Sequence, residues 1–181
     1  MQGQDKGLIK LSGRALISYV IEAIRVQAGP LLINAGRNMD GYRQFGYPVI
    51  NDQFDGFEGP LAGIASCMEA ADTELIVCVP CDSPFLADDL VARLYRDMLQ
   101  AQADICMAHD GRRPQPVFAL IKTGLLGSLQ AFLARGERKT DKWYAENRLA
   151  TSDFSDRPGT FMNINTPDDI LTASRRVDQG Q

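Results

Sequence analysis

The chain has 181 residues, of which 45% are hydrophobic and 23% are charged, and its formal net charge is −4. This length and composition predict one globular domain spanning residues 1–181, and the negative charge argues against a large nucleic-acid-binding face. No apolar run approaches the roughly 20 residues of a membrane helix, and no apolar signal segment opens the chain, so we expect a cytoplasmic protein that is not bound to a membrane.

Short apolar runs alternate with amphipathic helical patterns along the chain. In the first half, the sequence predicts a helix over 14–27, strands over 30–36 and 48–52, a helix opening within 59–64 and a strand over 74–80. In the second half, it predicts a helix over 88–100, strands over 103–108 and 116–121, helices over 124–135 and 139–146, a last helix beginning within 165–170, and a frayed tail over 173–181. This alternation predicts an α/β fold with a mostly parallel sheet flanked by helices.

Polar residues stand where three of the predicted strands end. Asn34 and Asp52 end the first two strands, and Asp82 follows the apolar run at 74–80. Because ligands of open α/β sheets bind outside the carboxyl ends of the strands, these side chains are candidates for one binding site. Asp82 is also a candidate Mg²⁺ ligand, since this cation takes one or two carboxylates together with phosphate oxygens. Ordinary turn chemistry is the alternative for each of them.

The pair C-V-P-C at 78–81 precedes Asp82 directly and raises the alternative of a redox or zinc site. In an extended strand its two cysteines lie about 10 Å apart on opposite faces, whereas a disulfide needs Cα atoms within roughly 7 Å. A zinc site needs about four ligands, and His109 is the only histidine. We therefore interpret the cysteines as buried, inert thiols in a reducing cytoplasm; the chain has four, Cys67, Cys78, Cys81 and Cys106.

Three further features have both a structural and a functional interpretation. The segment G-P-L-A-G at 59–63 opens a helix whose free N–H groups suit an anion, although a proline-initiated helix without a ligand has the same sequence. Asn163 and Asn165 would point the same way on an extended strand and could bind a polar heterocycle, or they could face solvent. From the residues alone, Lys6 is interpreted as a surface lysine.

Taken together, six stretches resemble molybdenum cofactor guanylyltransferase, a nucleotidyltransferase of Rossmann-like fold. They occur in the family's order: DKGLIKLSGRAL (5–16), INAGR (33–37), VINDQFDGFEGPLAGI (49–64), CVPCDSPFL (78–86), HDGRRPQPVFAL (109–120) and MNINTPDDI (162–170). The resemblance spans residues 1 to about 172. It implies transfer of a GMP moiety from GTP to the phosphate of molybdopterin, with release of pyrophosphate and with Mg²⁺ as the cofactor.

The resemblance also assigns roles to individual residues. Lys6 and Asp82 would be catalytic, and Asp82 would hold Mg²⁺. The nucleotide would be bound by Lys6, Asn34, Asp52 and Asp82. The molybdopterin side would be formed by Gly59, Pro60, Leu61, Ala62, Gly63, Pro116, Asn163 and Asn165. The implied partners are GTP, molybdopterin, and proteins of molybdenum insertion and cofactor delivery.

Sequences of this family begin with a strand and a glycine-rich phosphate loop, whereas this chain begins where that loop ends. From the resemblance we expect the first, central strand to be missing, and with it the loop glycines. Two explanations are open: the start codon was placed too late, or the protein is truly shorter. In the second case, unpaired strand edges and exposed apolar surface would weaken folding, and GTP binding would be poor.

Three alternatives to guanylyl transfer are open at this point. The same fold could use CTP in place of GTP. The chain could be a catalytically dead module that keeps the pterin side and contacts partner proteins. It could also be a nucleotidyltransferase that acts on a sugar phosphate.

Overall fold

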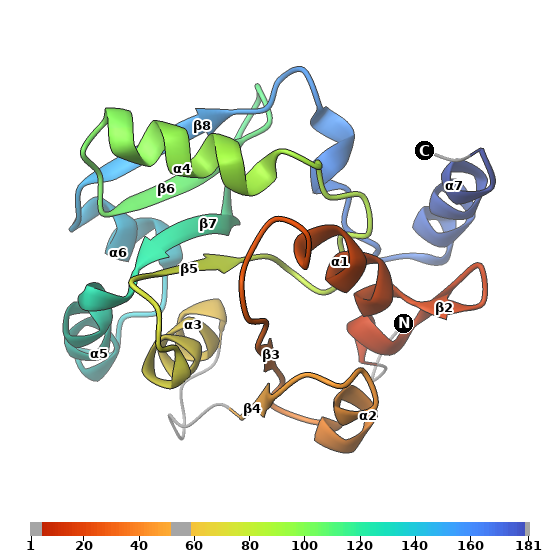
Figure 1. The fold of residues 1–181 in the computed structure, drawn as a ribbon, viewed down its shortest axis with the longest axis horizontal. Coiled ribbons are helices and arrows are strands. Elements are labelled where there is room, and N and C mark those ends of the chain that lie inside the picture. Colours follow the sequence, from red (N-terminus) through yellow and green to blue (C-terminus); the bar gives the residue numbers. More distant parts are fainter. Residues whose placement is uncertain (1–4, 52–58, 180–181) are drawn as a thin grey trace.

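The structure is a computed structural model that describes residues 5–51 and 59–179 (Figure 1). The α-helices are α1 (Leu16–Ile24), α2 (Met39–Arg43), α3 (Pro60–Ala70), α4 (Leu90–Gln100), α5 (Leu126–Ala134), α6 (Thr140–Ala145) and α7 (Pro167–Asp178). The strands are β1 (Lys10–Leu11), β2 (Arg14–Ala15), β3 (Ile33–Asn34), β4 (Val49–Ile50), β5 (Leu75–Cys78), β6 (Ile105–His109), β7 (Pro114–Lys122) and β8 (Leu149–Asp153). Short 3₁₀ helices are η1 (Lys6–Leu8), η2 (Thr123–Leu125) and η3 (Pro158–Phe161).

The main sheet has four strands in the order β5-β7-β6-β8. β5, β6 and β8 run in one direction, as expected of a mostly parallel sheet, and β7 is the one strand of this sheet that runs against them. The reason is the connection between β6 and β7. Only residues 110–113 separate these strands, and a link this short can join only antiparallel neighbours, because a parallel crossover needs about a dozen residues or more.

Two layers of helices cover the main sheet, as Figure 1 shows. On one face, α4 contributes Leu94 to the buried cluster that contains Phe118 and Leu120 of β7. On the other face, α3, α5 and α6 contribute to the cluster that contains Trp143 of α6 and Ile121 of β7. Successive side chains of β7 therefore enter opposite layers, as the pleat of a strand requires.

The strands β1 to β4 and the helices α1, α2 and α7 lie beyond the end of β5, toward the right of Figure 1. β3 and β4 pair in parallel as a separate two-stranded sheet, and β1 and β2 form an antiparallel pair. α1 buries Leu16 in one cluster with Ala173 of α7 and Ile17 in another with Tyr42 of α2. The frayed tail predicted over 173–181 is wrong as far as Asp178, because α7 continues to that residue and buries Ala173 completely.

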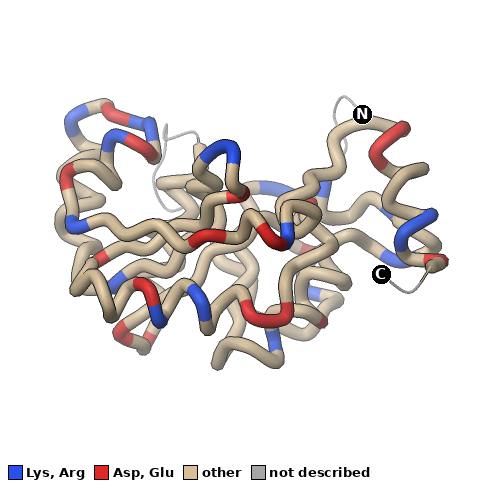
Figure 2. Tube along the Cα trace, turned by 90° about the horizontal axis from the view of Figure 1, so that it is seen from above, with Lys and Arg blue, Asp and Glu red and all other residues tan. Residues whose placement is uncertain are grey.

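Acidic and basic residues are interspersed along the described chain, as Figure 2 shows. Within residues 5–51 and 59–179, no helix is long and apolar enough to cross a membrane.

Candidate functional site

Lys6 and Asp82 lie together although 76 positions separate them in the sequence. Asp82 follows β5 and is 7% exposed, while Lys6 begins η1 and has a side chain that is 51% exposed. The Lys6 Nζ atom is 3.5 Å from Asp82 Oδ2 and also donates a hydrogen bond to Asn165 Oδ1. Three of the residues expected in the site thus meet from three distant segments.

The segment that carries the paired asparagines runs alongside the loop after β5. The backbone N–H of Ile164 donates to the Asp82 carbonyl at 3.0 Å, and Ser83 Oγ donates to Asn163 Oδ1 at 2.6 Å. The segment belongs to none of the strands, yet it keeps the expected alternation, because Ile164 is fully buried while Asn163 and Asn165 are exposed. The register places both amides on the side of the chain that faces away from the core.

Asn34 meets the first turn of α3. Its Nδ2 donates to the Ile50 carbonyl at 3.3 Å. A Cβ atom added at Gly63 would lie 2.2 Å from Asn34 Oδ1, so only glycine at this position leaves room for the amide. The contact joins a residue expected on the nucleotide side to one expected on the pterin side. Asp52 lies outside the described residues.

The start of α3 offers backbone groups rather than side chains. Gly59, at φ 112°, has the positive backbone angle that favours glycine, and Pro60 occupies the first helical position. Leu61 and Ala62 are each 1% exposed, and Leu61 belongs to the core cluster beneath the sheet. Their side chains face the core, so a contact with a substrate would come from their backbone N–H groups, and their place on the molybdopterin side stays a prediction.

Pro116 lies on β7, toward the end of the sheet at which β5 ends. It is three residues from Ala119, which pairs with Cys78, the last residue of β5. The carbonyl of Pro116 accepts a hydrogen bond from the Tyr144 hydroxyl at 2.8 Å. This contact ties Pro116 to α6.

A second carboxylate, which the sequence reasoning did not single out, stands next to Lys6. Asp5 has a side chain that is only 13% exposed, and it accepts a hydrogen bond from the Tyr42 hydroxyl. Asn38 Nδ2 donates to it at 3.3 Å, and Arg37 Nε lies 3.7 Å away. Burial, followed by the hydrogen bond to Asp5, raises the pKa of the Tyr42 hydroxyl well above its usual range. The position of Asp5 directly before Lys6 was the one feature of the sequence that could have pointed to it.

The cysteines of C-V-P-C have protonated thiols at neutral pH. Both are free. Burial raises the pKa of Cys78 to about 12, with a smaller contribution from Cys67. Burial also raises the pKa of Cys81 to about 11, and the neighbouring Asp82 and Asp5 carboxylates add to this shift. Because the thiolate is the reactive form of cysteine, these values support the interpretation of the pair as inert.

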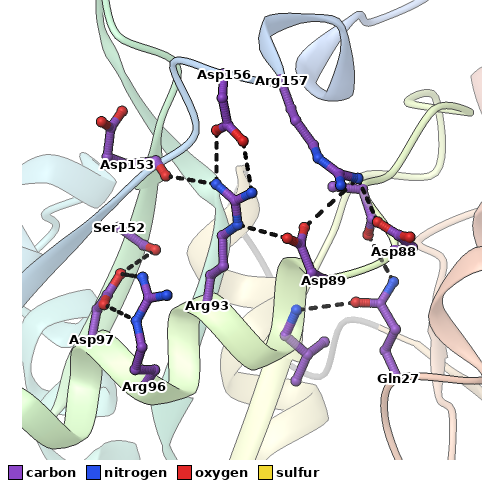
Figure 3. Close-up of polar contacts among 12 residues, drawn as sticks. Gln27, Asp88, Asp89, Arg93, Arg96, Asp97, Ser152, Asp153, Asp156 and Arg157 are labelled. Atoms are coloured by element: carbon purple, nitrogen blue, oxygen red, sulfur yellow. Dashed lines mark hydrogen bonds and ion pairs between the residues drawn. The ribbon is translucent and has the colours of Figure 1, made fainter.

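A group of ion pairs anchors the chain between β8 and η3, just before the paired asparagines (Figure 3). Arg93 of α4 binds both carboxylate oxygens of Asp156 at 2.7 Å and Asp89 at 2.8 Å. Arg157 pairs with Asp88, which follows the Asp82 loop. The hydrogen bond from Arg93 lowers the pKa of Asp156. These contacts fix the course of both segments that border the site.

The donor set around Asp82 matches one class of metal. Among the described residues, no three His, Cys, Asp or Glu side chains are grouped so as to enclose an ion. Asp82 supplies a single, largely buried carboxylate, with the amide oxygens of Asn163 and Asn165 on the adjacent segment. Such a set fits Mg²⁺, which takes one or two carboxylates and fills its remaining positions with water and phosphate oxygens.

Comparison with known proteins identifies related sequences. The family described as MobA-like NTP transferase domain matches residues 1–150. A molybdenum cofactor guanylyltransferase from Shewanella halifaxensis (strain HAW-EB4) is 46% identical over 168 residues, which are 93% of this chain and 84% of that protein. A protein of the same name from Shewanella loihica (strain ATCC BAA-1088 / PV-4) is 45% identical over 177 residues, covering 98% of this chain and 90% of that protein.

Solved structures share the fold. Molybdopterin-guanine dinucleotide biosynthesis protein A from Archaeoglobus fulgidus has a TM-score of 0.78 at 21% identity, covering 98% of this chain and 92% of that one. The 2-C-methyl-D-erythritol 4-phosphate cytidylyltransferase from Thermus thermophilus has a TM-score of 0.73 at 18% identity, covering 96% and 94%. The expected α/β nucleotidyltransferase fold is thus confirmed. At these identities the likeness concerns the fold alone.

Proposed function

The chain belongs to the family of MobA-like NTP transferase domains, and we propose that it transfers GMP from GTP to the phosphate of molybdopterin, with release of pyrophosphate. The curated relatives at 45–46% identity carry the name molybdenum cofactor guanylyltransferase. The observation that carries the proposal is the meeting of Lys6, Asp82 and Asn165 at the carboxyl end of β5. This is the edge of an α/β sheet at which ligands bind.

The reaction needs positive charge and alignment more than it needs a base. The attacking molybdopterin phosphate is already an anion, so its oxygen can attack the α-phosphorus of GTP without losing a proton. The bond between the α-phosphorus and the bridging oxygen breaks, and pyrophosphate leaves with the electron pair. The Lys6 ammonium would neutralise charge on the phosphates, and alignment of the two ligands would supply much of the remaining rate increase.

Nucleotidyltransferases of this kind typically use a divalent metal, and Asp82 is the residue that we propose to hold it. When bound, Mg²⁺ would add positive charge at the phosphate oxygens. The 3.5 Å separation of Asp82 Oδ2 from Lys6 Nζ would bring both cationic contributions to the same phosphates.

The two substrates divide the remaining residues between them. Asn34 is proposed to contact the nucleotide, and Asp52 stays a prediction for the same ligand. Asn165, because it bonds Lys6, would lie between the two substrates. The residues proposed for molybdopterin are Gly59, Pro60, Gly63, Pro116, Asn163 and Asn165, with Leu61 and Ala62 contributing backbone N–H groups only.

Partners and location follow from the same proposal. A product that must reach another protein implies contact with cofactor-delivery proteins, and the supply of its precursor implies contact with those of molybdenum insertion. We propose action in the cytoplasm, where the four cysteines of the chain would stay reduced.

The proposal is tested by measuring pyrophosphate release with Mg²⁺ and each pair of candidate substrates. We expect turnover with GTP and molybdopterin, and a loss on the order of 100-fold or more for Asp82→Asn and Lys6→Ala, as for other groups that stabilise charge in the transition state. Asp40→Asn is the control, because this carboxylate pairs with Arg43 on an exposed face of α2.

The alternatives give different results in the same assay. Faster turnover with CTP would assign the chain to cytidylyl transfer. Release with a sugar phosphate and without molybdopterin would assign it to another substrate class. Molybdopterin binding without turnover of any nucleotide would show a binding module.

A further inference from the structure

We infer that Asp5 and Tyr42 are positioning residues that hold Lys6 and Asp82 in register with each other. The inference rests on the proposed function, because it concerns how the phosphate-binding lysine is placed. Neither residue is assigned a role by the family resemblance. Their contacts reach both of the segments that supply the proposed catalytic side chains.

Asp5 fixes the start of η1, the short 3₁₀ helix that begins at Lys6. Its carbonyl accepts the N–H of Leu8 at 3.1 Å, and the Lys6 carbonyl accepts the N–H of Ile9 at 3.2 Å. Its carboxylate is held at both oxygens, by the Tyr42 hydroxyl at Oδ1 and by Asn38 Nδ2 at Oδ2. With both oxygens engaged, Asp5 is better placed to orient the backbone than to bind a ligand directly.

Tyr42 connects η1 to the loop after β5. The tyrosine is 3% exposed. A Cβ atom added at Gly7 would lie 2.6 Å from Tyr42 Oη and 3.1 Å from Cys81 Sγ. The hydroxyl therefore lies between the Asp5 carboxylate, Gly7 and Cys81. Gly7 follows Lys6 in the sequence, and Cys81 precedes Asp82. One buried oxygen thus contacts both catalytic segments, and it comes from a third element, α2.

The Lys6 side chain needs such support because it is half exposed and has four rotatable bonds. Ordering a lysine side chain loses more rotamer entropy than ordering most other side chains. A fixed backbone limits where the ammonium can reach, so less freedom remains to be lost when phosphate binds. Loosening η1 would therefore weaken nucleotide binding without removing any group that touches the nucleotide.

The experiment measures the dissociation constant of Mg·GTP by calorimetry for Tyr42→Phe in two backgrounds, the unsubstituted chain and Lys6→Ala. We expect about a ten-fold weakening in the first background, the scale of a lost hydrogen bond to a charged group. In the second background we expect little further loss, because a residue that acts through Lys6 has nothing to act on once the ammonium is gone. Equal losses in both would overturn the inference and show a general structural role.

Three other variants separate the remaining explanations. Tyr19→Phe is the matched control, since Tyr19 lies on α1 and its hydroxyl donates to the Leu11 carbonyl at 2.9 Å. We expect the Mg·GTP affinity of this variant to be unchanged. Asp5→Asn keeps an acceptor for Tyr42 and should bind Mg·GTP more tightly than Asp5→Ala. Equal weakening by these two substitutions at Asp5 would instead show that the carboxylate charge acts on the ligand itself.

A readout that needs no substrate separates this inference from the proposed function. Hydrogen exchange at the Leu8 and Ile9 amides should become faster in Tyr42→Phe and remain unchanged in Tyr19→Phe. If the unsubstituted chain fails to turn over or bind GTP, the proposed function falls, while faster exchange would still show that Tyr42 orders η1. Unchanged exchange in Tyr42→Phe would overturn the positioning role whatever the substrate is.

Discussion

Replacing Gly63 by alanine tests whether the contact between α3 and Asn34 serves nucleotide binding. The added methyl group would lie 2.2 Å from Asn34 Oδ1, far inside van der Waals contact, so one of the two must move. Asn34 is the more mobile partner because its side chain is exposed, whereas Gly63 lies in a buried helix. We expect the amide to rotate away and to lose its hydrogen bond to the Ile50 carbonyl.

Two opposing contributions set the change in stability. Alanine favours the helix over glycine by up to about 1 kcal/mol. Forcing extra volume into a packed site costs about 1–3 kcal/mol when nothing can move, and less when the end of a flexible side chain gives way. The free energy of unfolding should therefore change by no more than about 1 kcal/mol in either direction. The nucleotide affinity should fall by roughly two- to ten-fold, the loss expected for one hydrogen bond.

The assay combines urea unfolding with calorimetric titration of Mg·GTP. Gly127→Ala in α5 is the matched control, because a Cβ atom added there meets nothing within 4 Å. We expect this control to gain up to about 1 kcal/mol in stability and to keep its affinity. A Gly63→Ala variant with unchanged affinity would refute the reasoning, since it would show that the position of the Asn34 amide has no effect on the nucleotide.

Three further predictions concern stability. Leu94→Ala removes a fully buried side chain of α4 and should lower the free energy of unfolding by about 2–5 kcal/mol in urea titrations. Thr166→Ala removes the capping box of α7 and should cost about 1 kcal/mol in the same assay, with reduced helical circular dichroism. Hydrogen bonds from Arg148 and then Lys122 lower the pKa of Asp104, so this carboxylate stabilises the fold above its unfolded pKa of about 4. That contribution is lost as the pH falls through the lower folded pKa, and Asp104→Asn should flatten the dependence of stability on pH below about 4.

The fold could be predicted where burial leaves a clear pattern. The apolar runs located β5, β6 and β7 because these strands are covered on both faces. β8 was missed because it buries only Ala150 and Ser152, so no apolar alternation marks it. The direction of β7 was missed because it depends on the short connection after β6, a property of chain length and not of hydrophobicity.

The site was only partly predictable for a similar reason. The position of Asp82 followed from its place at the end of an apolar strand, whereas Lys6 entered through the family resemblance alone. The contact between Tyr42 and Asp5 joins residues 37 positions apart, and a tyrosine within a helix resembles any other core residue. Leu61 shows a further limit, since a motif position says nothing about which way its side chain points, and this one points into the core.

The candidate site combines a backbone held by hydrogen bonds with one half-exposed charged side chain, that of Lys6. The Asp169 carboxylate accepts the N–H of Asn165 at 2.9 Å and that of Thr166 at 2.8 Å, so the cap of α7 also holds the segment that bonds Lys6. Asp82 is held by its burial and by the pairing of its carbonyl with Ile164. Lys6 is then the component that can move, because its ammonium lies at the end of a half-exposed chain. A triphosphate that draws the ammonium away from Asn165 would meet an Asp82 carboxylate that is already in place. Binding would then require the movement of one side chain and not the ordering of the whole site, so less of the binding free energy would be lost.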